Sequence, residues 1–282
     1  MHGLPTRGPE MSGGESSIRV LATDPQGLTV DLHFDSDEVF LPPEWLEAAY
    51  HQAVIEWQRK LNYDSGRARP GSVTVTAAGV RLSGGPFLYS ETRALEQCVL
   101  AHRAGNFGAA LLDESAMVPS ASVVVSVLTD EGHLLVPRRS DTLVTLSGMW
   151  AAGLGEGLEP VDFLSSRPHE AVLRALSEEL AIEKSAVPEA AVRTLAVLQN
   201  ADTLSTMIFC VVDLTGAGGH FSAERVIARA ATAKDAWEHS EFRVIKPALS
   251  SFNEFLSDSA YGVCPGARTC ISILESYWNS KS

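Results

Sequence analysis

The chain has 282 residues, of which 45% are hydrophobic and 20% charged, so its length and composition argue against wholesale disorder and allow one large domain or two ordinary ones. The formal net charge of −13 argues against general nucleic-acid binding, which needs a basic surface, but not against a small anionic ligand held through a metal ion. No stretch approaches ~18 uninterrupted apolar residues, so we expect no transmembrane helix and no membrane partner.

The four cysteines, Cys98, Cys210, Cys264 and Cys270, form no C-x-x-C pair, which argues against a zinc site. Cys264 and Cys270 are candidates for a disulfide, but four thiols in a chain of this length fit a reduced protein, and we expect a cytoplasmic location. Residues 1–16 lack the apolar run of a secretory signal and are predicted to be a flexible tail.

Residues 17–118 are predicted to form an N-terminal α+β accessory region. In chain order the pattern predicts two strands in 17–34 around a turn at 24–27, a helix over 43–61, strands over 72–77 and 79–82, and a helix over 90–103. Segment 64–71 is predicted to be a loop, and Gly84-Gly85-Pro86 is expected to break the chain.

The pattern changes at Ala121, and residues 119–258 are predicted to form a second unit. Its expected elements are an apolar strand from 121, a hairpin turn at 130–132, a strand over 133–139, a glycine-rich stretch over 148–157, a helix over 167–182, strands over 192–199 and 205–214, a helix around 223–232 and a short helix over 247–256. Residues 259–282 are predicted to hold a last helix, 268–278, and a tail.

Helix 167–182 carries two adjacent carboxylates, Glu178 and Glu179. Its apolar side chains form one arc; Glu178 falls nearly opposite that arc and Glu179 at its edge. A carboxylate at the border of a buried face is costly unless its charge is compensated, by a divalent metal or by a basic group such as Arg174. The plain alternative is a solvated helix face in which Arg174 pairs with Glu170 or Glu178.

These elements together resemble the Nudix hydrolase domain over roughly residues 121–256. The family box is G-x5-E-x7-R-E-U-x-E-E-x-G-U, with U apolar, and its helical half is matched by Arg174, Leu176, Glu178, Glu179 and Ile182. The segments V-P-R-R at 136–139 and S-G-M-W-A-A-G-L-G-E-G at 147–157 are also similar to family members. The resemblance implies an α+β protein, a Nudix-like α/β/α sandwich with a mixed sheet, preceded by the accessory region.

Three positions depart from the family box. Ala175 stands where the family has the first helix glutamate, Ala181 where it has the closing glycine, and Ser166 where counting back from Arg174 puts the loop glutamate. The segment between the glycine-rich turn and the helix is several residues longer than the family spacing. Glu156 and Glu159 in that segment are candidates to replace the missing loop carboxylate.

The resemblance implies Mg²⁺ or Mn²⁺ as cofactor, because hydrolysis of a diphosphate needs a cation to neutralise the phosphates and bind the attacking water. The metal ligands it implies are Glu178, Glu179, Glu156 and the backbone of Gly155, with Gly153 as the other glycine candidate. Arg174 matches the arginine that orients a helix glutamate by a charge-assisted contact.

Other candidates come from outside the box. Glu238 or Glu241, in the segment 237–242, is expected to be a further metal ligand or the general base. Arg138 and Arg139 are expected to contact phosphate and Trp150 to stack on a base, with surface charge and packing as the ordinary alternatives. His239 lies close to two glutamates but is expected to be a surface residue.

The expected function is divalent-metal-dependent hydrolysis of a diphosphate linkage in a nucleoside diphosphate-X type metabolite, with a small-molecule partner. The accessory region is expected to shape specificity or to form a homodimer. One alternative is a Nudix-like nucleotide-binding module, a sensor or scaffold, that has lost hydrolysis, as Ala175, Ser166 and Ala181 favour. An isoprenyl diphosphate isomerase-like activity is a weaker alternative, because those enzymes use a cysteine near the glycine-rich turn and none stands between Met149 and Glu159.

Overall fold

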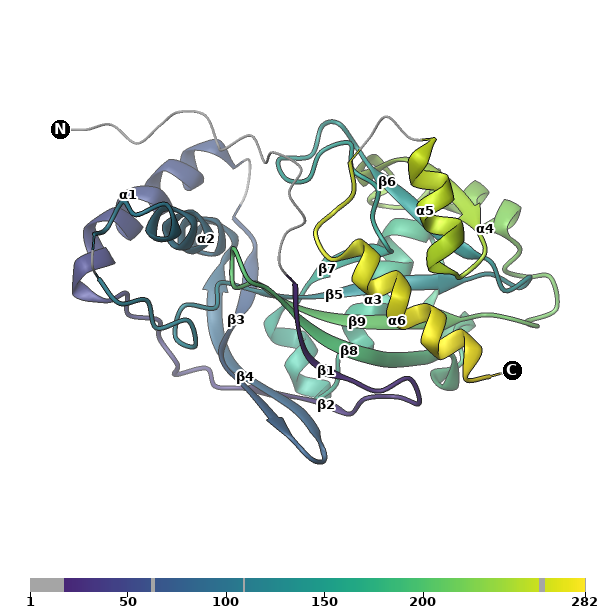
Figure 1. Ribbon diagram of the computed structural model, residues 1–282, viewed down its shortest axis with the longest axis horizontal. Helices are drawn as coiled ribbons and strands as arrows, with labels where there is room; N and C mark the ends of the chain where they lie inside the picture. Colours follow the sequence, from purple (N-terminus) through teal and green to yellow (C-terminus); the bar gives the residue numbers. More distant parts are fainter. Residues whose placement is uncertain (1–17, 62–63, 109, 259–261, 282) are drawn as a thin grey trace.

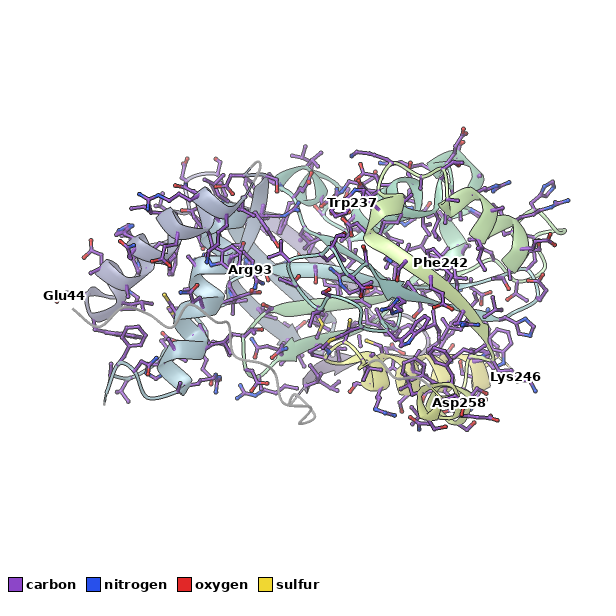
Figure 2. The ribbon with its side chains drawn as sticks, turned by 90° about the horizontal axis from the view of Figure 1, so that it is seen from above. Glu44, Arg93, Trp237, Phe242, Lys246 and Asp258 are labelled. Atoms are coloured by element: carbon purple, nitrogen blue, oxygen red, sulfur yellow. The ribbon has the colours of Figure 1, made fainter. Side chains whose placement is uncertain are left out.

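The computed structural model of the chain describes residues 18–61, 64–108, 110–258 and 262–281. The predicted tail, residues 1–16, lies outside the described residues. A helical N-terminal part forms one end of the molecule and a large sheet with its covering helices forms the other (Figure 1). Glu44, at the start of α1, marks the first end, and Lys246 and Asp258 lie toward the second (Figure 2). In the described part of the chain, no helix is both long and apolar enough to cross a bilayer.

The large sheet is mixed. Its strands are β1 (Ile18–Thr23), β5 (Ala121–Leu128), β6 (Leu134–Arg139), β7 (Leu154–Gly157), β8 (Val192–Asn200), β9 (Thr206–Asp213) and β10 (His239–Ile245). The order is β1-β8-β9-β5-β6-β10, with β7 paired to β5. Only β5 and β9 pair in parallel; the other pairs are antiparallel.

Helices cover both faces of this sheet, which is why its central strands are apolar on both sides. On one face α3 (His169–Leu180) and α4 (Ala223–Ala230) share a core with the alternate residues Val123 and Val125 of β5. On the other face α5 (Leu249–Ser257) and α6 (Ala267–Asn279) share a second core with β8 and β9 (Figure 1). The α+β class and the α/β/α sandwich with a mixed sheet are confirmed.

The N-terminal part contains a small sheet and a helix pair. Strands β2 (Val30–Phe34), β3 (Gly66–Thr76) and β4 (Gly79–Leu88) pair in the order β2-β4-β3, and α1 (Glu44–Lys60) and α2 (Tyr89–Arg103) pack around a third core. β2 and β4 are parallel, whereas β3 and β4 form an antiparallel hairpin. The division of the chain at residue 118 stays a prediction, because β1 belongs to the large sheet although it precedes this part.

Two predictions about the N-terminal strands are wrong. Residues 66–71 of the predicted loop belong to β3, and β4 runs through Gly84-Gly85-Pro86 without a break. Gly84 is needed inside the sheet because a Cβ there would overlap the backbone carbonyl of Arg69. The strands on either side of the predicted turn at 24–27 do not pair with each other: β1 pairs with β8 and β2 with β4.

The glycine-rich stretch is also more ordered than its composition suggests. It contains β7, and a short six-residue helix, η1 (Pro160–Ser165), fills the long connection to α3. Pro168 directly precedes α3, which is shorter than the predicted 167–182 and ends at Ala181 in a left-handed conformation. The one-turn helices η2 (Lys184–Ala186), η3 (Glu189–Ala191) and η4 (Ala236–Glu238) are shorter, and η4 leads directly into β10.

Candidate functional site

The two carboxylates of α3 have different surroundings. The apolar arc of the helix is buried against β5 and β7, and Glu179, at its edge, is only 3% exposed. Glu178, the preceding residue, lies outside that arc, and its Oε1 atom accepts a hydrogen bond from the ammonium of Lys234 at 2.7 Å. As expected from the helical period, Glu179 borders the buried face and Glu178 does not.

Glu179 is paired with His239, the first residue of β10. The Nε2 atom of His239 contacts Oε2 of Glu179, and both side chains are almost completely buried. Burial raises the pKa of Glu179 well above its ordinary value, and burial lowers the pKa of His239 to about 4. Burial thus favours the uncharged form of both groups. The Nδ1 atom of His239 is buried with no hydrogen-bond partner among the described residues.

His239 was expected at the surface, and that expectation is wrong. The strand β10 begins directly after η4, and its first side chain turns inward, where it packs against the ring of Phe242 at 5.2 Å. Figure 2 shows Trp237 just before this strand and Phe242 within it. No local pattern signals this burial: counting back from Phe242 in steps of two places Ser240, not His239, on the inward face, and a register shift between His239 and Glu241 alters the alternation.

Two further carboxylates lie close enough to these residues to affect them. Burial raises the pKa of Glu156, on β7, to about 7, with a further contribution from Glu178. Burial likewise raises the pKa of Glu238, on η4, to about 7, with a further contribution from Glu179. Carboxylates from a strand, a helix and a one-turn helix thus share one region near the C-terminal half of α3.

Arginines oppose part of this negative charge. The positive charge of Arg139 partly offsets the raised pKa values of Glu179 and Glu238. Its Nε atom donates to the backbone carbonyl of Thr145 at 3.4 Å. Arg174 does not orient a helix glutamate, as its place in the family box implied. Its guanidinium instead binds both carboxylate oxygens of Asp162, at 2.6 and 2.9 Å, and lies 3.5 Å from Glu156. Sequence reasoning missed Asp162, which no motif marks.

Arg138 and Trp150, which were predicted to bind substrate, are both buried. The guanidinium of Arg138 donates to the Gly148 carbonyl at 3.1 Å, to the Ser240 hydroxyl at 3.2 Å and to Asp141 at 3.0 Å. Trp150 is 2% exposed, and its ring packs edge-on against Phe255 at 4.7 Å. Both side chains thus stabilise the fold, and their contacts with a substrate stay predictions.

Glu241 lies apart from the other carboxylates. It pairs with Arg243 and sits opposite Arg138 in the strand register. Adjacent residues on a strand point to opposite faces, and Phe242 points toward the core under α3, so Glu241 points away from it. Of the two candidates for the general base, the structure places only Glu238 beside Glu179.

The two glycine candidates, Gly153 and Gly155, differ in the space around their Cα atoms. A Cβ on Gly153 would overlap the backbone of Val125, so this glycine is needed for the close approach to β5 rather than for a ligand. A Cβ on Gly155 would meet only the Nη1 atom of Arg139, at 3.9 Å. Gly155 therefore has open space beside the carboxylates, whereas Gly153 does not.

A divalent cation fits these residues by chemistry and by charge. Oxygen ligands are those that Mg²⁺ and Mn²⁺ prefer, and buried carboxylates with raised pKa values gain from a nearby cation. Among the described residues, however, no three His, Cys, Asp or Glu side chains already converge as a metal site. Metal binding would thus require these side chains to reorient.

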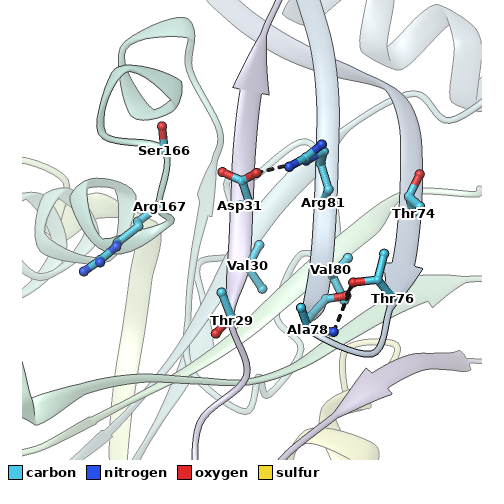
Figure 3. Close-up of a pocket in the computed structure, with 11 residues that line it drawn as sticks. Thr29, Val30, Asp31, Thr74, Thr76, Ala78, Val80, Arg81, Ser166 and Arg167 are labelled. Atoms are coloured by element: carbon cyan, nitrogen blue, oxygen red, sulfur yellow. Dashed lines mark hydrogen bonds and ion pairs between the residues drawn. The ribbon is translucent and has the colours of Figure 1, made fainter.

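A cavity of about 530 Å³ lies elsewhere, between β2, the β3–β4 hairpin and the segment before α3 (Figure 3). Its polar groups include Asp31 and Arg81, which pair at 2.9 Å, and Ser166 and Arg167 at its rim. The cavity adjoins the N-terminal end of α3, whereas Glu178 and Glu179 lie near its C-terminal end. Cavity volume therefore does not mark the carboxylate site.

Neither a protein family model nor a curated protein sequence matches the chain. Among solved structures, it is similar to a MutT protein from Methanosarcina mazei Go1, at 21% identity over 58% of this chain and 95% of that one, with a TM-score of 0.34. It is also similar to a mutT/nudix family protein from Listeria innocua, at 14% identity over 58% and 96%, with a TM-score of 0.37.

A third similar structure is the NUDIX domain of Shewanella oneidensis NrtR in complex with ADP ribose, at 14% identity over 57% of this chain and 87% of that one, with a TM-score of 0.35. All three are Nudix or MutT proteins, the family that the sequence resembles. With identities and TM-scores this low, the similarities say nothing about activity, metal dependence or substrate. The function of this chain has to be argued from its own residues.

Proposed function

We propose that the chain is a Nudix-type hydrolase that cleaves a diphosphate linkage in a nucleoside diphosphate-X type metabolite with Mg²⁺ or Mn²⁺. The observation that supports this most is the shared position of Glu156, Glu178, Glu179 and Glu238. Three separate elements bring these acids to one region, and burial makes the charges of Glu156, Glu179 and Glu238 costly without a cation.

The residues would divide the work by position. Glu156, Glu178 and Glu179 would hold the metal, which when bound neutralises phosphate charge and activates water. Glu238 is the candidate general base, since its pKa of about 7 lets it accept a proton near neutral pH. Arg139 would bind a phosphate oxygen. Cleavage would add water across the P–O–P bond and give two phosphate products.

A substrate panel tests the proposal. The protein would be incubated with nucleoside diphosphate-X compounds and Mg²⁺ or Mn²⁺, and phosphomonoester products would be measured. We expect Glu179→Gln and Glu238→Gln to lower turnover about 100-fold or more, because each removes a group that acts directly in the reaction. Glu170→Gln is the matched control, because Glu170 lies on the exposed start of the same helix, paired with Lys184. Full turnover in both site variants would contradict these roles.

The second candidate is a nucleotide-binding module without hydrolysis. It is favoured by the buried contact between Glu179 and His239 and by Ala175, which leaves the helix one acid short of the family set. Tight binding of a panel compound without turnover would support the module. Conversion without cleavage of the diphosphate would instead support the isomerase-like alternative.

A cytoplasmic location and a small-molecule partner belong to the same proposal. The four cysteines are free in the structure, and Cys98, Cys210 and Cys270 are buried, which fits a reducing compartment. Thiol titration of the native and unfolded protein after isolation under non-reducing conditions would check this. Four titratable thiols in the unfolded chain are expected.

A further inference from the structure

Arg174 is a mostly buried cation, and the two carboxylates one turn away on its own helix pair elsewhere: Glu170 with Lys184 and Glu178 with Lys234. Its side chain is 15% exposed. The next residue is the fully buried Ala175, at the position where the family box has a glutamate. A buried guanidinium is strongly destabilising unless it is paired and hydrogen-bonded. The partner must therefore come from another element.

That partner is Asp162, on η1, in the connection that is longer than the family spacing. Its carboxylate is fully buried and binds the guanidinium at two points, with Nη1–Oδ1 at 2.6 Å and Nη2–Oδ2 at 2.9 Å. The same Oδ2 atom accepts the backbone N–H of Glu159 at 2.8 Å. Asp162 thus stabilises the first turn of η1 and fixes the orientation of the Arg174 guanidinium.

The fixed guanidinium reaches the strand that carries Glu156. Its Nη2 atom donates to the backbone carbonyl of Gly157 at 2.9 Å and lies 3.5 Å from Oε1 of Glu156. One contact holds the backbone directly after Glu156 and the other holds its carboxylate. Asp162, Arg174 and Glu156 therefore form one connected path from η1 through α3 to β7.

We propose that Asp162 is a positioning residue for Glu156 and acts on it through Arg174. Asp162 supplies from η1 the negative charge that α3 lacks at Ala175. The role of Glu156 as a metal ligand rests on the proposed function, whereas the path between the three side chains does not. Without the charge of Asp162, the Arg174 guanidinium is no longer held in place. The end of β7, which that guanidinium contacts, then becomes more mobile.

The experiment uses Asp162→Asn, Arg174→Met and the double variant of the full chain. The Mn²⁺ dissociation constant is measured by electron paramagnetic resonance, and hydrogen exchange of residues 154–160 is measured without metal. We expect Asp162→Asn to weaken Mn²⁺ binding about 10-fold and to speed exchange, as loss of an outer-shell partner does. The double variant should be no weaker than Arg174→Met alone, because Asp162 acts through that arginine.

Two further variants separate positioning from general destabilisation. Arg174→Lys keeps the charge beside Asp162 but loses the two-point contact, and it should weaken Mn²⁺ binding even if Asp162→Asn fails to fold. Glu38→Gln is the matched control, because it removes the partner of another buried arginine, Arg69, at 3.1 Å in the N-terminal part. It should lower the unfolding midpoint without changing Mn²⁺ affinity.

The outcomes distinguish this inference from the proposed function. Unchanged exchange and Mn²⁺ affinity in folded Asp162→Asn and Arg174→Lys, or additive effects in the double variant, would overturn the positioning role. If the unsubstituted chain binds no Mn²⁺, the proposed function fails, and exchange of residues 154–160 alone then decides the inference. Faster exchange in Asp162→Asn, with no further increase in the double variant, would still support it.

Discussion

At the residue scale, Ala181 ends α3 in a conformation that usually belongs to glycine. Its φ and ψ angles are 50° and 38°, and its N–H donates to the Leu176 carbonyl, as does the N–H of Ile182 at 3.1 Å. The turn lets Ile182 return to the core directly after the helix. The backbone geometry expected at the family's closing glycine is therefore kept, although the glycine is not.

Ala181→Gly should stabilise the protein. A left-handed alanine costs about 1 kcal/mol relative to glycine, so the free energy of unfolding should rise by roughly that amount. Urea denaturation measures the change. Ala186→Gly is the matched control: Ala186 has no positive φ angle, so this change should be neutral or destabilising. An Ala181→Gly variant no more stable than the original would show that the left-handed turn is not strained.

The carboxylates of helix 167–182 could be anticipated from the sequence, but their partners could not. The helical period alone separates Glu178 from Glu179, because burial follows the apolar arc. Asp162 and His239 reach the site through tertiary contacts that join positions 12 and 60 residues apart. No local pattern encodes such contacts. The family box therefore predicts a helix glutamate as the partner of Arg174, whereas the partner is Asp162.

At the element scale, close approach of backbones decides which glycines matter. Gly153→Ala should destabilise the protein by about 3 kcal/mol, because the added methyl group overlaps the backbone of Val125 in β5. Gly155→Ala, two residues along, should unfold at nearly the same denaturant concentration as the original, because its methyl group meets only the end of Arg139. Equal stability of the two variants would contradict the close packing of β7 on β5.

The predicted elements succeed where local pattern and tertiary structure agree. The apolar runs of β5, β8 and β9 and the period of α3 fix those elements, because burial on both sheet faces leaves few polar positions. The pattern fails in β4 and directly before β7, where glycines that normally break strands, Gly84, Gly85 and Gly153, are required by neighbouring backbones. The same glycines therefore signal a loop in sequence and close packing in space.

At the scale of the whole molecule, the N-terminal part touches the segment that carries Asp162. Arg67, on β3, pairs with Glu159 at 3.0 Å, and the N–H of Ala68 donates to the Leu158 carbonyl at 2.9 Å. The accessory region is thus anchored beside β7 and η1. Its expected roles in specificity or dimer formation remain predictions, and light scattering would test the second.

The stability of the metal-free protein should fall as pH rises from about 6 to about 8. The pKa values of Glu156 and Glu238 are about 7 in the folded chain, against ordinary values of 4.5, so the folded state binds more protons in this window and loses that advantage as they leave. Unfolding midpoints at each pH measure the slope. The lowered pKa of His239 acts oppositely, but mainly below about pH 6.5.

A matched pair of variants checks the origin of this pH dependence. Glu156→Gln and Glu238→Gln should each flatten the slope, because an amide does not titrate. Saturating Mn²⁺ should also flatten it, since a bound cation keeps the carboxylates ionised. A slope that survives both substitutions would have to come from other groups.

The pairing of β1 with β8 also governs how the chain can fold. The first described strand, residues 18–23, finds its partner only at residues 196–200, so the large sheet cannot be completed until most of the polypeptide has been synthesised. Such distant contacts slow folding, and they leave the edge of β8 able to pair with other chains until β1 arrives. The N-terminal strand thus shields, late in biogenesis, a sheet whose other strands all come from residues 121–245.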